Sequence, residues 1–126
     1  MGVTSFSGPV LVGTTVEKTS SYTVVVNTDS GKQFISKTNC VVFTLPAIAT
    51  GEVYTFINTA ADGINDLSIS PNSSDGIMYL GTKVDNKDLI NTQATSKQGD
   101  FVVLVSLEET GAWQVSSIKG IWAKES

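Results

Sequence analysis

The sequence predicts an all-β fold: a single-domain antiparallel β-sandwich or barrel, jelly-roll-like or similar, with an extended N-terminal arm. Apolar residues recur at every second position in several short runs, which is the spacing of a half-buried strand. Glycine, proline, asparagine and aspartate separate these runs, and no segment carries apolar residues at helical spacing over three turns. The 126 residues suit one domain, which we assign to residues 21–126, with residues 1–20 as an arm or edge strand.

Three strand runs are predicted in the first half of the domain. Residues 21–27 ("SYTVVVN") are rich in β-branched and aromatic side chains, which strands favour. Residues 40–46 ("CVVFTLP") alternate apolar positions, and Pro46 ends the run. Residues 51–58 ("GEVYTFIN") alternate in the same way. The short connector "AIATG" between these last two runs predicts a hairpin.

The second half contains weaker runs and one strong hairpin signal. Short strands are predicted at "DLSISP", "GIMYLG" and "GIWA", whereas residues 84–98 are predicted to be irregular, with at most a helical turn. The segment "GDFVVLVSLEETGAWQVSSI" predicts two strands joined by the turn "EETG", with Trp113 in the core. In the first of these strands, alternate apolar residues share one face: Phe101, Val103, Val105 and Leu107.

The composition excludes several classes of partner. All eight basic residues are lysine and the net charge is −4, so the chain lacks the arginines and basic runs that bind nucleic acid. No apolar run approaches the length of about 20 residues that crosses a membrane, and the N-terminus does not resemble a secretory signal. Cys40 is the only cysteine, and its apolar neighbours predict a small buried side chain.

The sequence offers little for catalysis. There is no histidine, which removes the usual general base and the commonest zinc ligand, and no phosphate-binding glycine loop occurs. The aspartates of "DGIND" and "DNKD" lie among turn formers and are expected to bond their own backbone, although a calcium site and an acid–base pair stay open as alternatives. We therefore predict a protein that is not an enzyme, with no catalytic residues, no cofactor and no metal.

Aromatic residues leave a carbohydrate site open as well. Tyr22, Tyr54 and Tyr79, together with the two tryptophans, could form a platform on which sugars stack. All three tyrosines lie inside predicted strands, where packing into the core is the favoured role.

The arm and the last strand supply the candidate partner interface. The first 20 residues form a Ser/Thr/Gly-rich string with apolar residues spaced along it, which suits strand addition to a partner's sheet as well as a frayed tail. Trp122 lies in a terminal strand, so it either covers the core or packs at a subunit interface. The candidate interface residues are Val3, Phe6, Val10, Leu11, Val12 and Trp122.

The order of several motifs resembles small all-β structural proteins of tailed bacteriophages. These motifs are "FTLPAIATGEVYTFIN", "ADG", "LSISPNSSDGI", "NTQATSKQGDFVVLVS", "GAWQV" and "GIWA", and together they cover residues 42–123. In that pattern a "TLP" strand leads through small residues into an aromatic strand, and a tryptophan-containing hairpin ends the unit.

The resemblance implies a virion component, most like a capsid decoration, or cement, protein. Such a protein is made in the host cytoplasm and sits on the capsid exterior as a homotrimer, where it clamps neighbouring major capsid subunits. The alternative that the same resemblance implies is a receptor- or carbohydrate-binding module of a head or tail fibre. The short chain, without a repetitive stalk, favours decoration.

Overall fold

The computed structural model describes residues 14–107 and 111–125, and in these residues the chain is all-β. Besides the strands there is one short 3₁₀ turn, η1 (Gln93–Thr95), and no described helix is long and apolar enough to cross a membrane. The strands are β1 (Thr15–Glu17), β2 (Tyr22–Thr23), β3 (Gln33–Ser36), β4 (Val41–Thr44), β5 (Val53–Asn58), β6 (Leu67–Ser70), β7 (Gly76–Met78), β8 (Leu89–Asn91), β9 (Phe101–Val105), β10 (Ala112–Lys119) and β11 (Trp122–Lys124).

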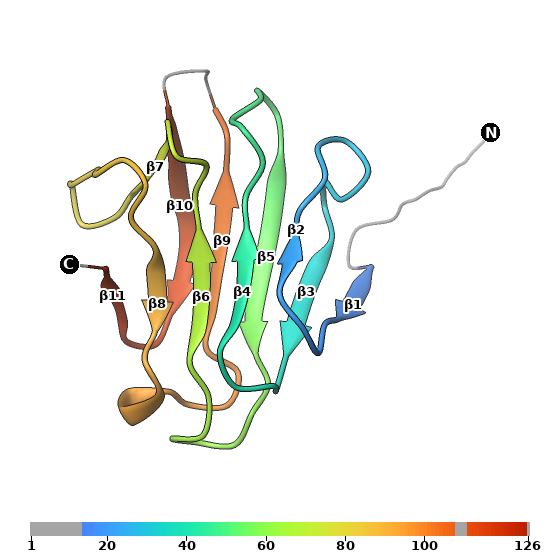
Figure 1. The fold of residues 1–126 in the computed structure, drawn as a ribbon, viewed down its shortest axis with the longest axis vertical. Helices are drawn as coiled ribbons and strands as arrows, with labels where there is room; N and C mark the ends of the chain where they lie inside the picture. The colour runs from blue at the N-terminus through green and yellow to red at the C-terminus, as the bar shows by residue number, and fades with distance from the viewer. Residues whose placement is uncertain (1–13, 108–110, 126) are drawn as a thin grey trace.

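The strands form two mixed sheets, one lying over the other (Figure 1). The six-stranded sheet has the order β1-β3-β5-β9-β10-β7, and the five-stranded sheet has the order β11-β8-β6-β4-β2. The predicted antiparallel pairing is wrong in part, because β1, β3 and β5 pair in parallel, as do β2, β4 and β6, and β7 pairs in parallel with β10. The other pairs are antiparallel.

The parallel pairs arise because the chain alternates between the sheets. Every connection between consecutive strands passes from one sheet to the other, except the β9–β10 hairpin. The antiparallel pairing of the two strands predicted on either side of "EETG" is therefore confirmed, although residues 108–110 of that turn lie outside the described residues. The hairpin predicted at "AIATG" is wrong, because β4 belongs to one sheet and β5 to the other. Long-range bonds hold that connector, including one from the Gly51 amide to the Ser106 carbonyl.

The core lies between the sheets and contains most of the large apolar side chains. Phe43 of the five-stranded sheet packs against Phe34 and Phe56 of the other sheet, with ring centroids 5.5 and 5.1 Å apart. Trp113 is fully buried, as predicted, and its ring lies 5.5 Å from that of Tyr54. The two Phe43 pairs cross between the layers, whereas the pair of Trp113 and Tyr54 lies within the six-stranded sheet. All three pairs have tilted geometry, which adds to the effect of burial.

A buried polar network closes one end of the core. The Asn91 amide nitrogen donates to the Asp100 carboxylate at 3.0 Å, and the Lys97 main-chain amide donates to the same oxygen at 2.9 Å. The Asn58 amide nitrogen donates to Asn91 at 2.8 Å. Asp100 is 1% exposed and lies directly beneath Gly120, so close that a Cβ at that position would overlap its carboxyl group. The turn before β11 is thereby tied to the core.

Cys40 differs from its prediction. Its side chain is exposed, and its main chain adopts a positive φ of 65° in the turn that leads into β4. The apolar alternation begins one residue later, at Val41, so the cysteine belongs to the turn and not to the strand. Its amide donates to the Asp66 carbonyl at 3.1 Å.

Asp29 fastens the loop at the opposite end of the core. The carboxylate is 1% exposed and accepts hydrogen bonds from the Tyr22 hydroxyl at 2.7 Å, from the Val25 amide at 2.8 Å and from the Lys32 ammonium at 2.8 Å. Burial alone would raise the pKa of Asp29, but these hydrogen bonds together outweigh it and lower the pKa below its usual value.

The lowered pKa of Asp29 predicts acid sensitivity. Stability from the ionised group is complete above the unfolded-state pKa of about 4 and is lost as the pH falls from there through the lowered folded-state pKa. We expect Asp29→Asn to be less stable than the wild type at neutral pH, with a flatter dependence of stability on pH in the acid range. Urea unfolding at a series of pH values measures this, and parallel pH profiles for the two proteins would contradict it.

Candidate partner-binding groove

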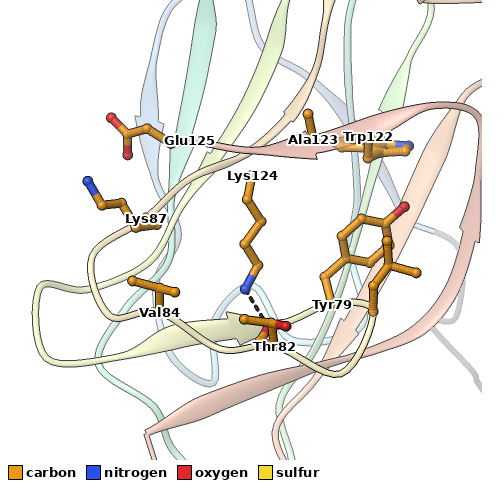
Figure 2. Close-up of a pocket in the computed structure, with 9 residues that line it drawn as sticks. Tyr79, Thr82, Val84, Lys87, Trp122, Ala123, Lys124 and Glu125 are labelled. Atoms are coloured by element: carbon orange, nitrogen blue, oxygen red, sulfur yellow. Dashed lines mark hydrogen bonds between the residues drawn. The ribbon is translucent and has the colours of Figure 1, made fainter.

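An apolar groove lies between β11 and the segment that follows β7. It has a volume of about 510 Å³. Figure 2 shows β11 forming one wall and the loop of residues 79–87 forming the other. The groove is lined by Tyr79, Leu80, Thr82, Val84, Lys87, Trp122, Ala123, Lys124 and Glu125.

Strand β11 brings a sheet edge to the groove. Among the described strands it is the outermost one of the five-stranded sheet and pairs with β8 alone, in the register Ala123 to Ile90. The Glu125 amide donates to the Asp88 carbonyl at 2.9 Å. Because hydrogen-bonded pairs alternate along antiparallel strands, the main-chain groups of Trp122 and Lys124 are directed away from β8. An edge of this kind can receive an extended segment of a partner.

The opposite wall contains a two-residue turn with an unusual residue. The amides of Tyr79 and Thr82 each donate to the other residue's carbonyl at 3.1 Å, and Leu80 and Gly81 between them have φ values of 52° and 78°. Asparagine or glycine normally occupies the first of these positions, because a branched apolar side chain is strained there. Leu80 is nevertheless 83% exposed, so its side chain gains little from the core.

Charged side chains also line the groove: Lys87, Lys124 and Glu125. Lys124 extends from β11 across the groove and donates a hydrogen bond to the Thr82 carbonyl, which Figure 2 marks. Burial lowers the pKa of the Lys124 ammonium. Beside the groove, burial raises the pKa of Asp88; a hydrogen bond from Ser70 opposes this, and the nearby charge of Glu125 adds to it. The groove therefore combines apolar lining residues with the ammonium group of Lys124, which is partly buried and hydrogen-bonded across the groove.

The structure places one of the predicted interface residues at the groove. Trp122 is 5% exposed and packs in the core, its indole nitrogen donates to the Lys119 carbonyl at 2.9 Å, and part of the side chain lines the groove. The other predicted interface residues, Val3, Phe6, Val10, Leu11 and Val12, lie outside the described residues.

Of the three tyrosines considered for a sugar platform, the structure brings only Tyr79 to this groove. Tyr54 is fully buried and donates to Glu52 at 2.6 Å, and Tyr22 is half-buried against Asp29. Leu80 was missed by sequence reasoning, although a signal was present: "YLGT" puts leucine where a tight turn before glycine favours asparagine or aspartate.

The fold is therefore all-β, with two mixed sheets and an apolar groove beside the edge strand β11. Within residues 14–107 and 111–125, no group of three or more acidic, cysteine or histidine side chains is arranged to hold a metal ion. The chain matches no model of a known protein family, and no curated protein resembles it significantly.

Proposed function

We propose that this protein is a β-sandwich virion protein of a tailed bacteriophage that decorates the capsid exterior, binds the major capsid protein and has no enzymatic activity. The single observation that carries the proposal is the apolar groove beside the free side of β11, with exposed Leu80 on its rim. It is supported by the motif order that resembles phage structural proteins.

The groove suits an extended segment of a capsid subunit. Main-chain groups on the outer side of β11 can pair with such a segment, and alternate side chains of the segment can enter the apolar groove. The side chain of Leu80 is already exposed in the unbound protein and can contact such a segment. Its strained turn position is consistent with selection for binding over stability. The arm residues Val3, Phe6, Val10, Leu11 and Val12 are proposed to add a second contact with the capsid.

Weak contacts are sufficient for such a role. A homotrimer presents three grooves to a lattice of identical subunits, and the linked binding events raise the overall affinity by several orders of magnitude. A protein that binds the assembled lattice but not free subunits stabilises the particle by linkage. The net charge of −4 disfavours adhesion to the packaged genome.

Leu80→Asn tests the groove because it should weaken binding while raising stability, whereas a variant that simply damages the fold would lower both. Asparagine tolerates the positive φ, so we expect the variant to be more stable by about 0.5–1 kcal/mol. Removal of the apolar contact should weaken overall binding to undecorated capsids of the phage at least about tenfold, which corresponds to about 1.4 kcal/mol in total. Co-sedimentation with capsids and thermal unfolding measure the two effects.

Ile64→Asn is the matched control, because Ile64 is 53% exposed and does not line the groove. We expect it to bind capsids as the wild type does. Equal binding by both variants would remove the groove from the proposal, and absence of capsid binding by the wild type would overturn decoration itself.

The second candidate is a receptor- or carbohydrate-binding fibre module. The observation that favours it is the meeting of Tyr79 and Trp122 in one groove, since aromatic faces stack on sugar rings. Saturable binding to a glycan array that Tyr79→Ala abolishes would favour this function over decoration.

A further inference from the structure

The outward face of the six-stranded sheet is unusually apolar at its centre. On β9, the buried Val102 and Leu104 alternate with half-buried Phe101, Val103 and Val105, which point away from the core. These three are among the four residues predicted to share a face, and the core takes the other face of the strand. Leu107, which continues the outward series, is 69% exposed.

Neighbouring strands extend this apolar area. In the sheet register, Ile57 of β5 lies opposite Phe101, and Val53 of the same strand lies opposite Val105. Ile35 of β3 lies opposite Ile57. We call these outward residues the outer face; it comprises Ile35, Val53, Ile57, Phe101, Val103 and Val105.

The corresponding surface of the five-stranded sheet is different. The outward positions of its central strands β4 and β6 are occupied by Val42, Thr44, Ser68 and Ser70, and three of these four carry hydroxyl groups. One sheet therefore presents a mostly polar outer surface, as expected of a solvated sheet, while the outer surface of the other is richer in valine, isoleucine and phenylalanine, with Thr55 of β5 opposite Val103.

Charges of opposite sign stand at the two ends of the outer face. One row across the sheet runs from Glu17 of β1 through Ile35, Ile57 and Phe101 to Lys119 of β10. Both end residues are exposed. Four strand spacings of about 4.8 Å separate them by about 19 Å. An apolar centre with charges confined to the rim is the arrangement found at protein–protein interfaces.

We propose that the outer face binds another copy of this chain, with Glu17 of one copy facing Lys119 of the next. The argument for a second copy is charge complementarity. The row is negative at one end and positive at the other, so the negative end in one copy can face the positive end in another copy. When copies are arranged in a ring around a symmetry axis, the outer face of each copy contacts the outer face of the next copy. Each such contact contains one pair in which Glu17 of one copy faces Lys119 of the next. A closed ring, such as a trimer, satisfies every face.

This inference concerns self-association and does not require capsid binding. The outer face and the groove are built by different residues, so one can fail while the other stands. It deepens the proposed homotrimer by assigning the surface through which the copies meet.

Light scattering coupled to size exclusion of the full chain tests the proposal. We expect the wild type to have a mass of at least twice the 13.3 kDa of one chain. Val103→Lys places a charge at the centre of the outer face and should yield the monomer mass. Ser68→Lys, an outward position on the other sheet, is the matched control and should keep the wild-type mass.

A charge exchange tests the same interface without disturbing the apolar centre. Glu17→Lys should weaken association at low salt, because two lysines then meet, and the added change Lys119→Glu should restore the wild-type mass. A monomeric wild type, or an unchanged mass in Val103→Lys, would overturn the inference. If Val103→Lys unfolds, the charge exchange decides alone: failure of the double variant to recover the mass lost by Glu17→Lys overturns it.

Discussion

Gly120→Ala is expected to destabilise the protein by at least about 3 kcal/mol, more than any other single methyl group added at a glycine. The Cβ would lie 2.3 Å from the Asp100 carboxyl carbon, and the main chain at this position has a φ of +100°, which side chains rarely adopt. The buried carboxylate would have to move away from Asn91 and from the Lys97 amide, which leaves charged and polar groups without partners. Urea unfolding measures the loss.

Gly31→Ala is the control for backbone strain alone. Its φ is +83° and no atom lies within 4 Å of the position of a Cβ. We expect this variant to lose about 1–2 kcal/mol from the positive φ. Similar losses in the two variants would show that Gly120 does not lie against the Asp100 network.

Phe43→Ala is expected to cost about 3–5 kcal/mol, because it leaves a cavity between the two sheets. Phe43 has no exposed surface, and its ring contacts Phe34 and Phe56 of the opposite sheet. The side chain therefore joins the layers, and its removal costs contacts on both. A loss of this size is a large part of the stability of a small domain, which is typically about 5–15 kcal/mol.

The conservative variant Phe43→Leu separates cavity formation from other effects. Leucine keeps much of the volume and should cost less than about 2 kcal/mol. Thermal and urea unfolding of both variants give the comparison. A small loss in Phe43→Ala would indicate that the two sheets do not pack through this residue.

Most of the longer strands were predictable because their signals are local. Strand β8, however, lies in residues 84–98, which were predicted to be irregular, and β3 was not predicted. Alternation of burial in β4, β5 and β6 follows the alternation of the sequence, and β10 begins at Ala112, directly after Gly111. Burial of Trp113 follows from its place on that strand.

Strand pairing could not be predicted, because the partner of each strand is distant in the sequence. Nothing in "TLPAIATGE" distinguishes a hairpin from a crossing between sheets; the bond from the Ile48 amide to Asp75 helps to fix the connector, and it spans 27 residues. Parallel pairs arise from such crossings.

The groove was only partly foreseen. Trp122 drew attention as a large residue near a sheet edge, but the opposite wall comes from the loop after β7, and periodicity says nothing about where a loop folds back. Strand β9 shows the same limit in another form. "FVVLV" is apolar on both faces, so the sequence alone does not tell which face enters the core.

The alternation of the chain between the two sheets has a consequence for how the protein folds. From β1 to β6 the chain alternates between the two sheets. Two strands that pair within one sheet are therefore separated in the sequence by a strand of the other sheet. Loop closure must therefore precede almost every pairing, which predicts folding in milliseconds to seconds and not in microseconds. The β9–β10 hairpin is the one pairing formed by consecutive strands, so it is the natural nucleus. Since β5 pairs with β9 and β4 with β6, neither half of the chain can complete a sheet before the other has been synthesised.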